Sequence, residues 1–398
     1  MASSTVRVVD WAALAVLAFE VPSFLFSQYR ANSASTVEAI AVAVLVYILI
    51  RIQILTPLQA GWMAGIVAIG GSWLAALSLR QFAGRAEKLA DAGLTDVVAF
   101  RSQLAQSIQG WVPGEGFTVL LQALAFACAT TVYIWRTGRH KLSVLTLVAP
   151  TLVAIAIPLS LSRAVFWSTV LFFLVACALM IGYRIITLKA GALLLAVVPG
   201  FVLLIVVCES ALFPGIFTAY TGHHATQVRS AQGRLGIWNR SLEVMRQHPL
   251  WGMGSSNAAL FLLSTADQEE TTGFASRPFS LPIQILVEKG IIGFGLYALF
   301  VVLVGYEFHR TMRSGPQKNV PQLLPSNGKG RINPPRKQQA VQFRMEAAHK
   351  AMKCCFAAGL MAVLFRELTY SSLMEHVLTL ALAFALAALA CGEVGATA

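Results

Sequence analysis

The sequence has little charge for its length. Of its 398 residues, only 12% are Asp, Glu, Lys or Arg, and 57% are hydrophobic. Soluble domains carry about 25% charged residues and about 45–50% apolar residues. Half the usual charge cannot cover the surface of a water-soluble protein of this length. The composition therefore argues against a cytosolic enzyme, a disordered chain and a disulfide-rich secreted module.

The chain also lacks the short motifs of metal and nucleotide chemistry. Its six cysteines include no CxxC pair and no Cys/His spacing of the kind that binds zinc. There is no Walker loop, HExxH, GxSxG or EF-hand pattern. These absences argue against an ATP-driven pump and a zinc protease, and we predict neither a metal nor a cofactor.

Long apolar blocks are what the sequence does have. They run for roughly 16–25 residues, about the length that crosses a bilayer as a helix. No small-residue cleavage site follows the first block, so we expect it to be a retained span. We predict an all-α, polytopic integral membrane protein of about ten transmembrane helices: 11–26, 37–55, 61–79, 117–135, 142–161, 164–183, 190–208, 283–307, 354–368 and 376–392.

Basic residues set the predicted orientation. The stretch 309–353 carries ten Lys and Arg against one acid, and the connections 136–141 and 184–189 are also basic without acids. Positive loops normally face the cytoplasm. The net charge of +12 therefore mainly reflects the basic loops that set the orientation of the protein in the membrane. We predict no nucleic-acid partner. Pro and Gly in 309–353 indicate a largely flexible linker. The predicted parts are an N-terminal bundle of about seven spans (1–208), a long periplasmic loop carrying the site (209–282), and C-terminal spans with the basic cytoplasmic loop (283–398).

The periplasmic loop contains an amphipathic pattern. Leu235, Trp238, Leu242 and Met245 recur at steps of three and four, which predicts an apolar stripe on a helix at the membrane surface. Pro249 fits the end of that helix, because the residue before a proline disfavours the helical region. A Gly-rich turn is expected to follow.

Arginines suggest the chemistry of this loop. Arginine binds phosphate bidentately and stays charged at any working pH, so a cluster at the outer membrane surface suits a pyrophosphate-linked lipid. Taken singly, each arginine also fits a contact with solvent or a lipid headgroup. Five lie in the loop and one lies between two spans: Arg229, Arg234, Arg240, Arg246 and Arg277, with Arg163.

Three linked blocks stand out over roughly 160–300: Ser162-Arg163, then Arg234-x-x-x-Trp238 with His248-Pro249-Leu250-Trp251-Gly252-Met253-Gly254, then Gln284 to Gly293 at the start of the next span. Together they resemble the O-antigen ligase/polymerase (Wzy-type) superfamily. The resemblance implies a bacterial inner-membrane glycosyltransferase that works on the periplasmic side. Its donor would be a glycan linked to undecaprenyl pyrophosphate, and its acceptor another saccharide or lipid A–core, in contact with membrane lipid.

One position departs from the ligases of this superfamily. They carry His-Asn nine and eight residues before the Glu of the last block, whereas this chain has Phe279 and Ser280 before Glu288. Phenylalanine cannot accept a proton. Three explanations stay open: a polymerase-type enzyme that relies on arginines, a base supplied by another residue, or lost catalysis. The candidates for another base are His223, His224 and His248, and the acids Asp267, Glu269 and Glu270.

We predict that Arg163 and Arg234 hold the pyrophosphate as the catalytic pair. Several other residues are candidates for binding the substrate. These residues also suit interface anchors, an ordinary turn or the start of a span. The favoured function is a Wzy-like polymerase of exopolysaccharide or O-antigen repeats. The alternatives are a ligase that transfers glycan to lipid A–core, and a non-enzymatic transporter of lipid-linked glycans. A transporter would favour charged or broken helices through the bilayer midplane, and outside Glu288-Lys289 the spans show almost none. The further substrate-binding candidates are Arg240, Arg277, Trp238, Gly252, Gly254 and Glu288.

Overall fold

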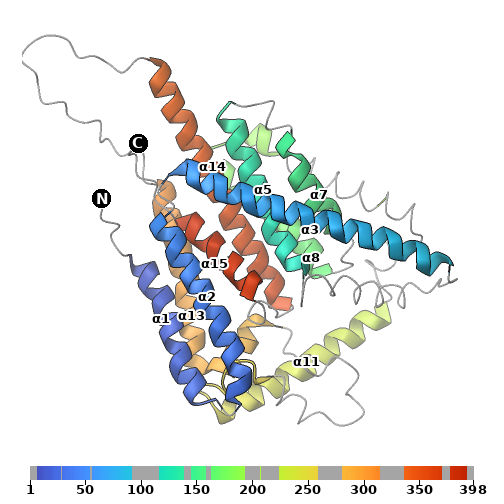
Figure 1. Cartoon of the computed structure of the whole chain (residues 1–398). Coiled ribbons are helices and arrows are strands. Elements are labelled where there is room, and N and C mark those ends of the chain that lie inside the picture. Colours follow the sequence, from blue (N-terminus) through green and yellow to red (C-terminus); the bar gives the residue numbers. More distant parts are fainter. Residues whose placement is uncertain are drawn as a thin grey trace, which may run out of the picture.

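The structure is a computed structural model that describes eleven stretches of the chain. They are residues 7–27, 29–53, 56–91, 116–138, 145–157, 163–192, 207, 224–258, 280–313, 336–369 and 377–391. The long elements in these stretches are α-helices (Figure 1). They are α1 (Val8–Leu25), α2 (Arg30–Gln53), α3 (Pro57–Asp91), α5 (Gly116–Arg136), α7 (Val148–Ala156), α8 (Arg163–Gly182), α11 (His224–Gln247), α13 (Leu281–Arg313), α14 (Arg336–Thr369) and α15 (Val377–Cys391).

The helical class and the membrane character are as predicted. Within the described residues, six helices are long and apolar enough to cross a bilayer: α1, α2, α3, α5, α8 and α13. The chain is therefore a polytopic membrane protein. Helices α7, α14 and α15 cover three further predicted spans with shorter apolar stretches. The predicted span 190–208 lies outside the described residues except for 190–192 and 207.

Small residues let the helices approach closely. Helices α1, α2 and α13 pack together, α15 packs on α2, and α5 packs on both α3 and α14 (Figure 1). A Cβ added at Gly71 of α3 would lie 2.2 Å from Ala123 Cβ, and one at Gly359 of α14 would lie 2.4 Å from Ala125 Cβ. Such contacts are typical of membrane helices, which gain packing energy by close backbone approach.

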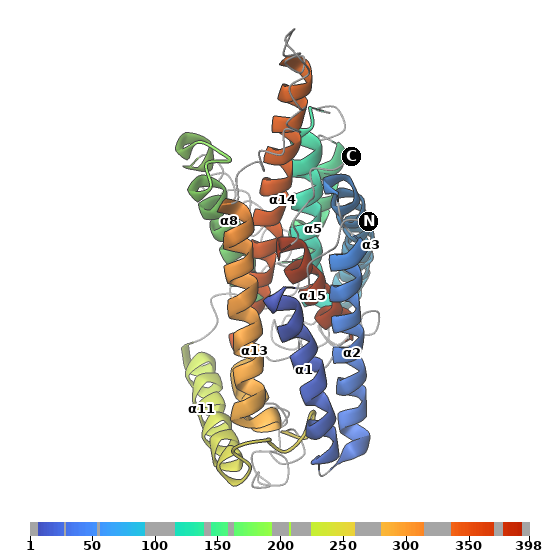
Figure 2. The ribbon, with the colours of Figure 1, turned by 90° about the vertical axis from the view of Figure 1, so that its left-hand side faces the viewer.

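Helix directions follow the alternation that the predicted topology requires. Gln122, near the start of α5, donates to the Thr379 carbonyl at the start of α15 (2.8 Å). Arg136, at the end of α5, donates to the Ile185 carbonyl just after α8 (2.6 Å). The starts of α5, α8 and α15 therefore share one end of the bundle. Figure 2 shows α11 beside the start of α13 at the lower end, opposite the start of α14.

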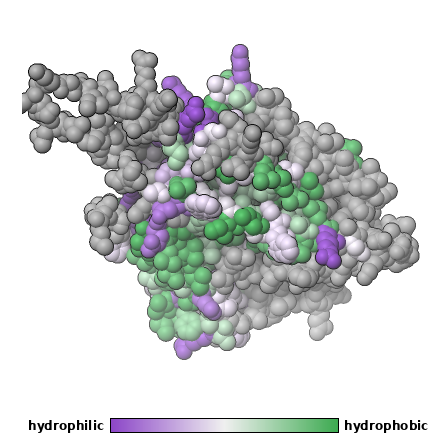
Figure 3. Space-filling model, turned by 45° about the horizontal axis from the view of Figure 1, so that its top comes forward, coloured by the Kyte–Doolittle hydropathy of each residue, from purple (hydrophilic) through white to green (hydrophobic). Residues whose placement is uncertain are grey.

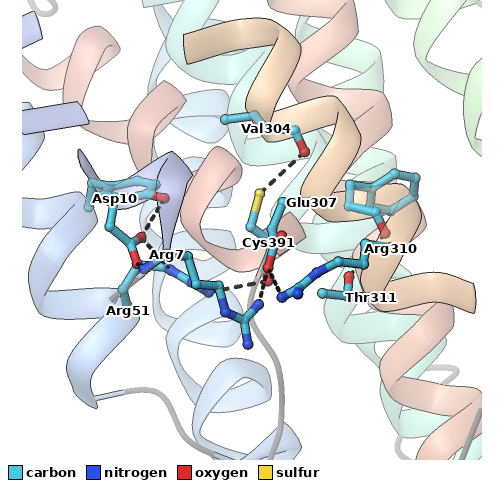
Figure 4. Close-up of polar contacts among 10 residues, drawn as sticks. Arg7, Asp10, Arg51, Val304, Glu307, Arg310, Thr311 and Cys391 are labelled. Carbon is cyan, nitrogen blue, oxygen red and sulfur yellow. Dashed lines mark hydrogen bonds and ion pairs between the residues drawn. The ribbon is translucent and has the colours of Figure 1, made fainter. Parts of the chain in front are cut away.

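A charged network closes the end opposite α11. Arg7 and Arg310 both donate to Glu307, the latter at 2.8 Å (Figure 4). In the same region Arg51 Nε donates to Asp10 Oδ1 at 3.0 Å, and Arg51 also reaches the Cys391 carbonyl at 3.2 Å. These contacts tie α1, α2, α13 and α15 together. The gathering of arginines at this end agrees with its predicted cytoplasmic position.

The linker expected over 309–353 is shorter than predicted. Helix α13 continues to Arg313, and α14 already begins at Arg336. Every Pro and Gly of that stretch lies between these helix ends, so the flanks contain no residue that breaks a helix. Within α14, Glu346 and Lys350 form an i,i+4 ion pair at 2.9 Å, which supports helix there.

The surface is apolar where a bilayer would contact it. Figure 3 shows hydrophobic residues gathered over one side of the molecule, with few hydrophilic residues among them. On α3, an exposed stripe repeats at steps of three and four: Trp62, Ile66, Ile69 and Trp73. An exposed apolar stripe of this length suits lipid chains rather than water.

Candidate functional site

Helix α11 contacts the protein mainly through residues outside its predicted apolar stripe. It ends at Gln247, two residues before Pro249, as expected. Its buried face, however, is formed by Ile237, Ser241 and Val244, whereas Leu235 is 55% exposed and Leu242 37% exposed. The two leucines of the stripe therefore point away from the bundle, which is compatible with the predicted membrane-surface helix. The apolar residues of a membrane-surface helix can contact either protein or lipid, and the spacing of leucines alone does not distinguish the two.

A small apolar cluster fastens the end of α11 to the bundle. Val244 packs with Met253 and Ala258 of the following turn and with Val287 of α13. Figure 1 shows α11 slanting outward from the lower ends of α1, α2 and α13, so this contact is made at one end of the helix. The position of α11 consequently depends on how the turn 248–257 is held.

The turn is held by backbone pairing with a break in α13. At Gly290 the α13 backbone leaves helical geometry, with φ 63° and ψ −169°. The Val287 and Glu288 carbonyls, freed by the break, accept hydrogen bonds from the N–H groups of Met253 (3.1 Å) and Gly254 (2.9 Å). On the other side of the break, the Ile291 and Ile292 N–H groups donate to the carbonyls of Pro249 (2.9 Å) and Leu250 (3.4 Å). Inside a membrane, a broken helix needs such replacement partners.

Glycine is required on both sides of this pairing. Gly252 (φ 68°) and Gly254 (φ 93°) adopt the left-handed conformation that other residues rarely accept. A Cβ at Gly252 would lie 2.3 Å from the Glu288 carbonyl carbon, and one at Gly254 would lie 2.5 Å from Ser27 Cβ. The Gly254 N–H is used by Glu288, and the Gly252 N–H donates to the His248 carbonyl at 3.0 Å. Their N–H groups therefore hold the turn together, as in the ordinary turn that these two glycines also suit.

A buried ionic cluster lies beside the break. Lys289 Nζ is 2.6 Å from both carboxylate oxygens of Glu20 on α1 and 2.6 Å from Ser255 Oγ in the turn. Ser255 Oγ also donates to Glu20 Oε2 at 3.1 Å, and the Tyr297 hydroxyl donates to Glu20 Oε1 at 3.2 Å. The side chains of Lys289 and Glu20 are both fully buried. Three elements, α1, the turn and α13, meet in this cluster.

Uncharged side chains extend the contact to α2. Ser33 Oγ donates to the Ser255 carbonyl at 2.7 Å and is 2.7 Å from Ser27 Oγ. Asn257 Nδ2 donates to Ser27 Oγ and to the Met253 carbonyl, both at 2.8 Å. The turn is thus bonded to α1, α2 and α13 together, and Trp251 stacks on Phe19 of α1 with ring centroids 5.7 Å apart.

Some of the site residues predicted from the sequence lie in the described parts of the chain, and others lie outside them. Position 163 is the first residue of α8, and position 234 lies in α11, three and seven residues before Ile237 and Ser241. Trp238, Arg240 and His248 are half-buried, and Glu288 is buried with Gln284 Nε2 donating to it at 3.3 Å. Position 224 begins α11. The structure's described residues exclude His223, Asp267, Glu269, Glu270, Arg277 and Phe279.

The spans contain a buried ion pair whose partners the sequence does not identify. The spans do carry charge outside Glu288-Lys289, because Glu20 lies buried within α1. Lys289 is paired with Glu20 and not with its neighbour Glu288. The sequence does contain a signal for this pair: Glu20 and Lys289 each lie in an apolar run. Ionisable residues at membrane depth normally need a partner. Among the described residues, no three His, Cys, Asp or Glu side chains converge as metal ligands would.

Residues 148–298 match the family model described as O-antigen ligase. This part of the chain is similar to the O-antigen ligase family. It begins at the first residue of α7 and ends inside α13, so it contains α8, α11, the glycine turn and the break at Gly290. Members of the family act on lipid-linked glycans as ligases or polymerases. Glu20 of α1 lies outside the O-antigen ligase segment, although it completes the ion pair within it. No curated protein matches the chain.

Proposed function

We propose that this protein is a Wzy-like glycosyltransferase that polymerises exopolysaccharide or O-antigen repeats on the periplasmic side of the inner membrane. The donor is a saccharide carried on undecaprenyl pyrophosphate. The observation that carries the proposal is the position of residue 234 within the O-antigen ligase family segment. By helical register, position 234 falls on the same face of α11 as Ile237 and Ser241, which are buried.

Helical register supports this placement of position 234. Residues three, four and seven positions apart share one face of a helix. Ile237, Trp238 and Ser241 stand in those positions after 234, and they are buried or half-buried. Arg246 occupies the opposite face, where its side chain is 75% exposed. Position 163, at the first turn of α8, adds the positive end of a helix dipole, which favours an anion.

The reaction we propose is displacement at the anomeric carbon of the donor sugar. A hydroxyl oxygen of the acceptor forms the new C–O bond, and the bond from that carbon to the lipid pyrophosphate oxygen breaks. The pyrophosphate leaves with the electron pair, and the hydroxyl proton passes to a base. Arg163 and Arg234 neutralise the charge that develops on the leaving pyrophosphate. We propose no metal in this step, and we assign the base to no single residue among the loop histidines and acids.

The residues at 279 and 280 favour a polymerase over a ligase. Ligases that resemble this chain place His-Asn there, and this chain has Phe and Ser. Because phenylalanine cannot accept the proton of a lipid A–core hydroxyl, the ligase arrangement is incomplete at that position. Polymerisation by charge neutralisation at a good leaving group is consistent with this replacement.

The broken helix does not favour the transporter alternative. Transporters place such breaks near the bilayer midplane. Gly290 is twenty residues before Arg310, so the break lies about 30 Å along α13 from the basic end. That distance is about the thickness of the hydrocarbon core, which is consistent with a break at the outer boundary. A break at the surface suits a site that receives a lipid headgroup from the bilayer.

The test is elongation by the purified protein in proteoliposomes. Given undecaprenyl-pyrophosphate-linked repeats alone, with EDTA present, we expect a ladder of glycans that lengthens one repeat at a time on the lipid. A parallel reaction supplies lipid A–core as acceptor. Glycan appearing on lipid A–core without a ladder would replace the polymerase proposal with the ligase.

A further inference from the structure

The buried cluster at Lys289 does more than balance charge. Lys289 Nζ is bonded to Glu20 of α1 and to Ser255 of the turn, all at 2.6 Å, and the next residue in the chain is the break at Gly290. We infer that Glu20, Lys289 and Ser255 are positioning residues that set where α11, and with it Arg234, stands relative to the bundle.

The burial of the pair makes a chance contact a poor explanation. Removing two charges from water is costly even when they meet, and a hydrophobic pair of similar volume often does as well for stability. Both side chains have an exposed fraction of 0%, and both lie in apolar helices. Ionisable side chains at membrane depth are rare and usually have a functional task. The cluster therefore needs a reason beyond stability.

The contacts suggest that reason, because they run without a gap from Lys289 through the turn to α11. Lys289 Nζ donates to Ser255 Oγ in the turn. Two nearby residues of the same turn, Met253 and Gly254, donate their N–H groups to the carbonyls of Val287 and Glu288. Met253 in turn packs on Val244 of α11. A shift of the turn is thus passed to α11 over a few packed residues. Catalytic groups displaced by about 1 Å lose on the order of a hundredfold in rate, so a rigid mount for α11 has a direct effect on transfer.

The variant Ser255→Ala distinguishes a role in positioning α11 from a role in balancing the charges of Glu20 and Lys289. It leaves the Glu20–Lys289 pair in place and removes only the hydroxyl that joins the pair to the turn. This inference rests on the proposed function, and the readout is kcat and donor KM for glycan elongation in proteoliposomes. We expect kcat to fall at least roughly tenfold with a small change in KM and in melting temperature. The matched control is Ser72→Ala in α3, whose hydroxyl donates to a carbonyl of its own helix, Ala68, at 2.7 Å; it should keep wild-type kcat.

A charge-removing series completes the test. Glu20→Gln alone leaves a buried lysine without its carboxylate and should lower the melting temperature. Glu20→Gln combined with Lys289→Met removes both charges and should restore stability while kcat stays low, because the bond to Ser255 is still missing. Recovery of kcat together with stability in the double variant, or wild-type kcat in Ser255→Ala, would overturn the positioning role.

Amide hydrogen exchange distinguishes a failure of this inference from a failure of the proposed function. Exchange over Ile237–Gln247 needs no substrate. We expect it to be faster in Ser255→Ala and in the double variant than in Ser72→Ala. If wild-type protein elongates no glycan but exchange rises as expected, the polymerase proposal fails and the positioning of α11 stands. Unchanged exchange in both variants contradicts the positioning itself.

Discussion

Arg234→Ala and Arg163→Ala are each expected to lower glycan elongation by about 100-fold or more, without loss of expression or folding. Removing one preorganised contact to charge that develops in a transition state costs on the order of 3–4 kcal/mol. Arginine binds a pyrophosphate through two parallel hydrogen bonds, which lysine does not reproduce. Arg234→Lys and Arg163→Lys should therefore recover only part of the lost rate. The measurement is the initial rate of elongation at saturating lipid-linked donor.

Arg246→Ala is the matched control on the same helix. Arg246 is 75% exposed and forms a surface ion pair with Glu243 at 3.0 Å. Such pairs contribute about 0–1 kcal/mol to stability, so this variant should elongate glycan within about twofold of wild type. Near-normal rates for Arg234→Ala and Arg163→Ala would remove both residues from the pyrophosphate site. An equal loss in Arg246→Ala would point to the general charge of α11 instead.

Gly290→Ala is expected to damage the fold more than any other single methyl addition along α13. Gly290 has φ 63°, and its added Cβ would lie 2.3 Å from the Leu250 carbonyl oxygen, a backbone atom that cannot turn away. The left-handed conformation alone costs a residue with a side chain about 1–3 kcal/mol. The clash would also separate the turn from the break, so we expect a lower melting temperature together with loss of elongation.

Gly295→Ala provides the comparison within the same helix. An added Cβ at Gly295 would meet nothing within 4 Å, and its backbone is helical. Alanine favours helix over glycine by about 1 kcal/mol, so this variant should be as stable as wild type or more so. Equal melting temperatures for the two variants would show that the pairing of the turn with the break contributes little to the fold.

Much of the architecture follows from local sequence signals. Apolar length predicts the helices, and the arginines at one end of the bundle agree with the predicted orientation. Pro249 predicts the end of α11 correctly, because a proline acts on the residue directly before it. Likewise, the Pro and Gly residues between 314 and 335 lie where α13 and α14 are separated, although the helices reach further into that stretch than composition suggests.

The details of the candidate site depend on contacts between distant segments. Glu20 and Lys289 are 269 positions apart, and neither has a neighbour in sequence that identifies its partner. Gly252 and Gly254 predict a turn, but their N–H groups gain partners only because α13 breaks at Gly290. The apolar stripe of α11 predicts an amphipathic helix at the membrane surface but not which residues contact the protein, because a hydrophobic period does not distinguish lipid from protein.

The release of undecaprenyl pyrophosphate tests the central claim most directly. Purified protein in proteoliposomes is supplied with lipid-linked repeats, and both the new glycosidic bonds and the freed lipid pyrophosphate are counted. The proposed displacement predicts one molecule of lipid pyrophosphate for every bond formed, on the side of the membrane where α11 lies. Movement of intact lipid-linked glycan across the bilayer with no lipid pyrophosphate released would contradict glycosyl transfer and support a transporter.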